Sequence, residues 1–208
     1  MPTRKPVSHQ PPGAAAVQRV VATARRHFLS QGFRRVTMDE LADELGMSKK
    51  TLYGLFPSKT ALVEAVILDK FRRAEADLRR ITAASRGDVP GALRRLVAAV
   101  QTHTQEIQAP FVRDIQRDAP HLFEVVERKR RGLIRRHFGK LLSEGRRARV
   151  IRRDIPMPLA MEILLGTVQA VMNPPKLIEL GLTPEQGYSA IMSVIFEGLI
   201  VGTPRRLS

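Results

Sequence analysis

The chain has 208 residues, with 35 Lys and Arg against 20 Asp and Glu, which gives a formal net charge of +15 at pH 7. Such a basic protein suits a polyanion or an acidic membrane surface as partner. The lack of Cys excludes disulfide frameworks, zinc ribbons, iron–sulfur clusters and thiol catalysis. No apolar run has the length of a membrane span, and the N-terminus lacks the apolar region of a secretory signal. We therefore expect a soluble, cytoplasmic protein without a membrane partner.

Helical periodicity dominates the chain, and no stretch alternates as a strand would. Residues 1–13 are Pro-rich and polar, so we expect a disordered arm, in which Arg4 and Lys5 could reach a DNA minor groove. The next segment predicts a helix that ends near Gly32 in a left-handed cap. Its apolar face consists of Val17, Val20, Val21, Ala24 and Phe28.

Three helix starts follow in close succession. Residues 37–40 read Thr-Met-Asp-Glu, a capping box that predicts a short helix ending before Gly46. Ser48 is a second N-cap candidate, for a helix that continues to about residue 56. Pro57-Ser58-Lys59 then ends that helix and begins a longer one that reaches about residue 83.

The remainder of the chain predicts five more helices. Their expected starts are at Asp88-Val89-Pro90, Pro110, Pro120, Pro156 and Thr183-Pro184. We expect Pro174-Pro175 to end the helix that follows Pro156. The fold class is therefore all-α, with about nine helices, no internal repeat and no long linker.

The helices on either side of Leu45-Gly46-Met47-Ser48 form a helix-turn-helix pattern. If Leu52 and Phe56 are core positions, the second helix presents two ammonium groups, a hydroxyl and a phenol on its outer face. These groups belong to Lys49, Lys50, Thr51 and Tyr53, and they suit phosphates and base edges in a major groove. The cation of Lys59 is unfavourable at a helix N-terminus unless an anion such as phosphate lies against it. An ordinary solvated helix pair is the less favoured alternative, because cap, turn and exposed cations coincide here.

Residues 14–60 closely resemble the DNA-binding domain of TetR-type (TetR/AcrR) transcriptional regulators. The resemblance is carried by Phe28, Gly32-Phe33, residues 37–42, Gly46-Met47-Ser48, residues 51–53 and residues 56–59. It implies a helix-turn-helix at about 37–56 and an effector-binding and dimerisation domain at 61–208. It also implies a homodimer that binds a pseudo-palindromic double-stranded DNA operator, more often as a repressor than as an activator.

The same resemblance assigns roles to individual side chains. Thr37, Tyr53 and Lys59 would contact phosphates, while Lys49, Lys50 and Thr51 would lie at base edges or flanking phosphates. We add Ser48, at the start of the second helix, to this set of DNA-binding residues.

Two positions depart from the family's usual pattern. Gly54 and Leu55 stand where such proteins often carry a large polar or aromatic residue. Gly54 should weaken its helix by about 1 kcal/mol relative to Ala. Lys50, where a small residue is common, supplies a charge that replaces part of the lost affinity.

The charge is distributed unevenly over the second half of the chain. Residues 121–160 hold 12 basic and 4 acidic residues, whereas residues 161–208 hold 3 and 4. A near-neutral, apolar segment in a basic protein is typical of a self-associating surface. We therefore expect a homodimer through the last two helices, about 156–172 and 184–200, with plain core helices of a monomer as the alternative. Small residues that would allow close approach are Gly166, Ala170, Ala190 and Gly198.

The sequence offers less about a ligand. The residues that could line an effector pocket are apolar, which suggests an apolar effector, although core positions are the favoured interpretation for most of them: Phe111, Phe123, Phe138, Met161 and Met172. The Arg-rich stretch 128–153 allows three readings: a solvated helix face, non-specific attraction to DNA or anionic lipid, or a site for an anionic effector. We favour the solvated face.

Enzyme and metal functions find little support. His103-x-x-Glu106 and His121-x-x-Glu124 each place two possible metal ligands on one helix face, but ordinary polar residues are the favoured interpretation. No Gly-rich phosphate loop, H-E-x-x-H or G-x-S-x-G motif occurs. We expect no catalytic residue, metal or cofactor. The alternatives to a regulator are a non-specific architectural nucleic-acid-binding protein and, least favoured, a helical-bundle enzyme or metal carrier.

Overall fold

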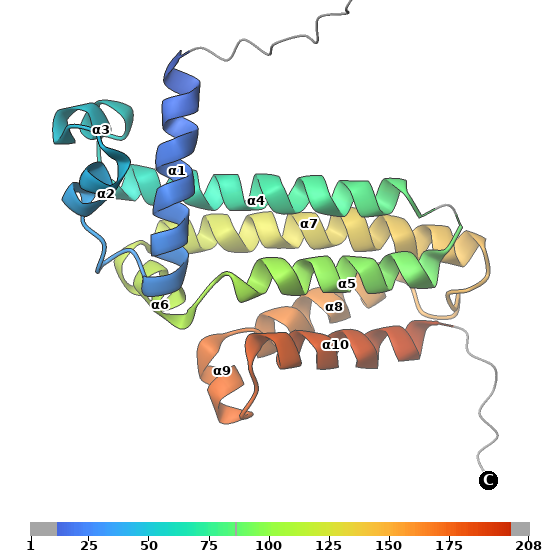
Figure 1. Cartoon of the computed structure of the whole chain (residues 1–208). Helices are drawn as coiled ribbons and strands as arrows, with labels where there is room; N and C mark the ends of the chain where they lie inside the picture. Colours follow the sequence, from blue (N-terminus) through green and yellow to red (C-terminus); the bar gives the residue numbers. More distant parts are fainter. Residues whose placement is uncertain (1–11, 86, 201–208) are drawn as a thin grey trace, which may run out of the picture.

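The computed structural model describes residues 12–85 and 87–200, which form ten α-helices (Figure 1). They are α1 (Pro12–Gln31), α2 (Met38–Leu45), α3 (Lys49–Leu55), α4 (Lys59–Ala83), α5 (Val89–Gln105), α6 (Ala109–Asp118), α7 (Pro120–Arg147), α8 (Met157–Val171), α9 (Pro174–Glu179) and α10 (Pro184–Leu199). Within those two ranges there is no β-strand, and one isolated antiparallel bridge joins Ile151 and Ile200. The all-α prediction is confirmed.

The structure differs from the predicted elements in two details. The described part of the chain has ten helices rather than about nine because Pro174-Pro175, which follows α8, also begins α9. Asn173 Oδ1 caps α9 by accepting a hydrogen bond of 3.0 Å from the Lys176 N–H. Proline is favourable in a first turn because the N–H that it lacks would have no partner within the helix there. In addition, α1 starts at Pro12, so Gly13 belongs to a helix and not to the arm. The rest of the predicted arm, with Arg4 and Lys5, lies outside the described residues.

The three N-terminal helices pack around an aromatic and aliphatic core. Phe28 of α1 is fully buried, and its ring meets that of Phe33 edge-on at 6.5 Å between centroids. The same core continues along α4 as far as Ile67 and includes Phe111 and Ile115 of α6. The N-terminal core therefore extends past residue 60 and joins α1, α2 and α3, here called the head, to the start of the C-terminal helices.

The C-terminal helices surround a second core. Figure 1 shows α4, α7 and α5 running side by side, with α8 and α10 along one edge and α1 crossing the end near α6. The rings of Phe138 on α7 and Phe196 on α10 stack at 6.0 Å in this core. Because α4 contributes to both cores, a shift of this helix would be felt by the head and by the C-terminal helices together.

In the part of the chain that the structure describes, no single helix has both the length and the apolar composition of a membrane span. The bent pair α3 and α4, at 58° to each other, meets those two criteria only when the helices are taken together.

Candidate nucleic-acid interface

Thr37 fixes the start of α2. Its Oγ1 accepts a hydrogen bond of 3.1 Å from the Glu40 N–H, and Glu40 Oε2 accepts one of 2.7 Å from the Thr37 N–H. These reciprocal bonds complete the capping box that the sequence predicts. The hydrogen bond from the Thr37 backbone, followed by that from its hydroxyl, lowers the pKa of Glu40, so this carboxylate stays ionised at neutral pH. The Thr37 side chain remains exposed at the edge of the head.

Gly46 sets the turn between α2 and α3. Its backbone is left-handed, with φ 63° and ψ 35°, and its N–H donates to the carbonyl groups of Ala42 and Asp43. The Met47 N–H also donates to the Ala42 carbonyl, at 3.0 Å. Glycine adopts this conformation without steric cost, which explains why a glycine follows α2. The turn brings α3 against α2.

One side of α3 is buried against the head and the other side is exposed. Leu52 is fully buried, and Ser48 Oγ caps the helix by accepting a hydrogen bond of 3.0 Å from the Thr51 N–H. The four residues expected on the outer face are all exposed: Lys49, Lys50, Thr51 and Tyr53. Tyr53 is 42% exposed, so its ring is available to a partner.

The two lysines of α3 differ in their surroundings. The Nζ atom of Lys49 lies 2.6 Å from Asp39 Oδ2 in an exposed ion pair, and the hydrogen bond to Asp39 raises the pKa of Lys49. Lys50 has no acidic partner among the described residues. The sequence placed Asp39 in the first turn of α2 but gave no sign that it would reach across to α3.

Lys59 sits at the start of α4 beside the loop between α1 and α2. Its Nζ atom donates to the Arg34 carbonyl at 3.3 Å, and burial lowers the pKa of this lysine. Arg34 and Arg35, in the same loop, are exposed and precede Thr37 by three and two residues, respectively. The sequence analysis did not include these two arginines among the candidate DNA-binding residues. Two adjacent cations beside an N-cap are nevertheless a pattern that suits phosphate binding.

The seven residues predicted to bind DNA therefore lie at the N-terminus of α2, along α3 and at the start of α4. Thr37, Ser48, Lys49, Lys50, Thr51 and Tyr53 are exposed, and Lys59 is half-buried. The dipole of α2 and the cations of α3 and α4 give this end of the molecule the positive character that a phosphate backbone requires.

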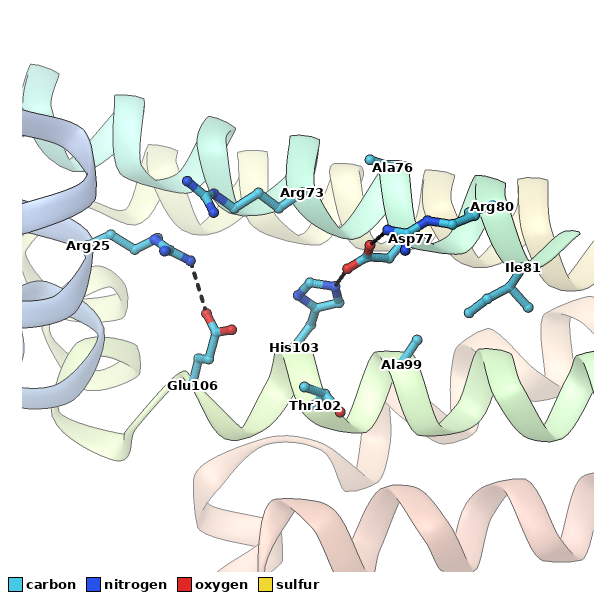
Figure 2. A pocket seen from close by; sticks show the side chains of 10 residues that line it. All are labelled: Arg25, Arg73, Ala76, Asp77, Arg80, Ile81, Ala99, Thr102, His103 and Glu106. Atoms are coloured by element: carbon cyan, nitrogen blue, oxygen red, sulfur yellow. Dashed lines mark hydrogen bonds and ion pairs between the residues drawn. The ribbon is translucent and has the colours of Figure 1, made fainter. Parts of the chain in front are cut away.

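The five residues predicted to line an effector pocket do not come together. Phe111 and Phe123 belong to the N-terminal core, whereas Phe138, Met161 and Met172 belong to the C-terminal core. They are apolar at helical spacing because they fill the contacts between helices. A cleft of about 630 Å³ lies elsewhere, between α4 and α5, and none of the five lines it (Figure 2).

The two His-x-x-Glu pairs have different surroundings. His103 Nε2 lies 3.0 Å from Asp77 Oδ2, and Glu106 Oε2 accepts a hydrogen bond of 2.6 Å from Lys70 Nζ. His121 and Glu124 are exposed. Residues 12–85 and 87–200 contain no group of three or more His, Asp or Glu side chains arranged to hold a metal ion.

Several arginines of the Arg-rich stretch are paired with acids of neighbouring helices. Arg131 and Arg135 both meet Glu162 of α8, and Arg136 lies 2.7 Å from Glu75 of α4. These contacts agree with a solvated face that holds helices together.

Residues 20–66 match the family described as "Bacterial regulatory proteins, tetR family". The HTH-type transcriptional regulator EthR of Mycolicibacterium smegmatis is 31% identical over 88 residues, which are 42% of this chain and 41% of that protein. An uncharacterized HTH-type transcriptional regulator of Bacillus subtilis, YvaF, is 23% identical over 185 residues, or 88% of this chain and 94% of that protein.

Solved structures share the fold over almost the whole chain. The Flavonoid-responsive Regulator FrrA is 26% identical with a TM-score of 0.58, covering 91% of this chain and 100% of its own. A TetR transcriptional regulator from Chloroflexus aurantiacus is 16% identical with a TM-score of 0.67, covering 91% and 98%. The family match over residues 20–66 confirms the resemblance that residues 14–60 carry. The four similar proteins named above are all described as regulators.

Proposed function

We propose that this chain is a transcriptional regulator of the TetR family that binds a pseudo-palindromic DNA operator as a homodimer and leaves it when a small-molecule effector binds. The observation that carries the proposal is the outer face of α3. Lys50, Thr51 and Tyr53 project from a helix whose opposite side is locked by Leu52. Such a face can enter a major groove while the head stays folded.

A homodimer is supported by the outer surface of α8 and α10. Ile163 on α8 and Val194 on α10 are exposed, the latter by 75%. Gly166 and Gly198 face open space, because an added Cβ would meet no other atom within 4 Å. Exposed apolar side chains beside small residues allow two copies to approach closely, in an intermolecular four-helix bundle.

The proposed dimer explains how an effector could control DNA binding. Successive major-groove faces lie about 34–36 Å apart, so two α3 helices must keep a compatible spacing. Because α4 contributes to both cores, an effector that tilts α4 in each subunit changes that spacing. The name of FrrA, which states a response to flavonoids, supports a response to a small molecule here. By linkage, effector and DNA must weaken each other's binding by the same factor.

Selection from a pool of random duplexes at about 150 mM salt tests this function, because a non-specific binder falls steeply in affinity with salt and shows no preferred sequence. The proposal expects a pseudo-palindrome with two half-sites. It also expects the Lys50→Ala variant to bind more weakly and with a flatter salt dependence, while Arg79→Ala on the exposed side of α4 serves as the control. A pool that stays random would support the architectural alternative.

A further inference from the structure

A charged cleft lies where the head meets α4 and α5. Its volume is about 630 Å³, within the range of small-molecule sites. Figure 2 shows Arg25 of α1 reaching into one end, with Ile81 and Ala99 at the other and His103 between them. The complete lining consists of Arg25, Arg73, Ala76, Asp77, Arg80, Ile81, Ala99, Thr102, His103 and Glu106.

Most polar groups of this cleft are already well paired. Asp77 accepts a hydrogen bond from Arg80 and lies 3.0 Å from His103 Nε2. Arg73 Nε donates to Asp69 Oδ2 at 2.8 Å. These side chains have little unused hydrogen-bonding capacity toward a ligand.

Arg25 is different. Its Nε atom is buried and has no hydrogen-bond partner, since the nearest carboxylate oxygen, of Asp69, is 3.8 Å away. Its Nη1 atom reaches Glu106 Oε2 only at 3.4 Å, and that oxygen is held by Lys70 Nζ at 2.6 Å. A buried guanidinium nitrogen without a partner is costly. Because the contact between Nη1 and Glu106 is long and shared with Lys70, a ligand carboxylate could form a shorter, charge-assisted hydrogen bond with this end of the guanidinium.

The charge of the lining favours an anion. Three arginines face two carboxylates in the lining, and behind it the ammonium group of Lys70 is balanced by the carboxylate of Asp69, which leaves an excess of one positive charge. Toward the opposite end, Ile81 and Ala99 offer an apolar surface, beside Arg80, whose guanidinium is bound by Asp77 (Figure 2). The cleft therefore presents the cation of Arg25 and an apolar surface at Ile81 and Ala99 to one bound molecule.

We infer that this cleft binds an organic anion, with its carboxylate on Arg25 and its apolar part against Ile81 and Ala99. This assignment rests on the proposed function, because it makes the cleft the effector site, and it replaces the apolar effector expected from the sequence with an amphipathic anion. Arg25 belongs to α1, so the ligand touches the head directly. A carboxylate on Arg25 competes with Glu106 and loosens the tie between α1 and the end of α5.

Isothermal titration calorimetry with the full chain tests the site, using 2-naphthoate and its neutral analogue 2-naphthamide as probes. The two molecules have nearly the same shape, so the comparison isolates the carboxylate. We expect naphthoate to bind at least about tenfold more tightly than naphthamide, and Arg25→Gln to remove about tenfold of that affinity. Arg79→Gln, on the same helix as the cleft but outside its lining, is the control.

A second variant tests the site independently, in case Arg25→Gln does not fold. Ala99→Phe fills the apolar end and should weaken naphthoate and naphthamide alike, with helicity and melting temperature monitored by circular dichroism. Equal binding of the two probes, or full affinity in Arg25→Gln, would overturn the site. Undetectable naphthoate binding at about 1 mM would overturn it as well.

The regulatory role has its own readout. Naphthoate should weaken DNA binding of the wild type but not of Arg25→Gln. Naphthoate binding that leaves DNA affinity unchanged would overturn the role of the cleft as effector site. Failure of the chain to select any DNA sequence would instead reject the proposed function, and the calorimetric result would still decide whether the anion site exists.

Discussion

The Oδ2 atom of Asp114, on α6, accepts a hydrogen bond of 2.9 Å from the backbone N–H of Arg34, in the loop between α1 and α2. A second link lies close by, where the Gln108 N–H donates to the Leu29 carbonyl at 2.8 Å. The ring of Phe33 packs edge-on against that of Phe111 at 6.4 Å. Helix α6 is therefore attached to the head at the end of α1, and a movement of α6 would also move the loop that leads into the helix-turn-helix.

Gly32 is required by this contact. Its φ is +82°, and an added Cβ would overlap the Asp114 carboxylate and lie 3.2 Å from the carbonyl carbon of Pro110. Gly32→Ala should therefore lower the free energy of unfolding by about 1–3 kcal/mol, because strain and crowding add. Urea denaturation followed by circular dichroism measures the change.

Gly54→Ala provides the matched control. Gly54 lies in α3 without positive φ, and an added Cβ meets no atom within 4 Å. Alanine there should stabilise the chain by up to about 1 kcal/mol, since it removes the entropy cost of a glycine in a helix. Equal effects of the two substitutions would contradict the assigned role of the contact between α6 and the head.

Asp39→Asn should increase DNA affinity by about two- to fivefold at low salt, because it frees Lys49 and removes a negative charge beside the proposed phosphate contacts. The same change should slightly destabilise α2, since Asp39 lies in its favourable first turn. Fluorescence anisotropy on a selected duplex measures the affinity. Glu64→Gln, an exposed site on α4, is the charge-matched control, and a decrease in affinity for Asp39→Asn would refute the idea.

Stability should fall as the pH drops from 7.5 to 5.5. Burial lowers the pKa values of His103 and His137 below their usual value of 6.5. The folded chain therefore resists protonation that the unfolded chain accepts, and stability present above pH 6.5 is lost below it. The carboxylates with lowered pKa values, such as Glu75 and Glu106, contribute only near and below pH 4.5.

Melting temperatures of the wild type and of a His103→Gln/His137→Gln double variant separate these contributions. The double variant should lose less stability than the wild type over the same range. An identical decrease in both proteins would show that other groups cause the pH dependence.

Val194→Glu should convert the proposed dimer to monomer, because a charge would then lie in an apolar contact between two copies. Sedimentation velocity measures the change in mass. Leu68→Glu, at an exposed apolar position on α4, introduces the same charge away from α8 and α10 and should remain dimeric. If both variants keep the mass of the wild type, the interface lies elsewhere.

The local elements were readable from sequence because their signals are local. Thr37, Gly46 and Ser48 determine where α2 and α3 begin and end through bonds to residues within five positions. The exposure of the α3 outer face followed from spacing alone. The all-α class followed in the same way, while α9 was missed because proline serves both to end and to begin a helix.

The contacts between distant segments could not be read in this way. Asp39 reaches Lys49, and Arg25 reaches Glu106, only because tertiary packing places their helices side by side. The apolar character of Phe111 and Phe138 was compatible with a pocket or a core but could not say that they belong to two different cores. For the same reason, the cleft could not be predicted, because its charged residues come from three helices and no single helix shows a recognisable sequence pattern for it.

Fluorescence anisotropy with DNA from upstream of the gene for this chain tests the central claim most directly, when compared with a scrambled duplex at about 150 mM salt. A specific regulator should prefer its own upstream DNA by about 10³-fold or more. Equal binding to both duplexes would mean that charge alone holds the protein on DNA, and it would contradict sequence-specific regulation at that site.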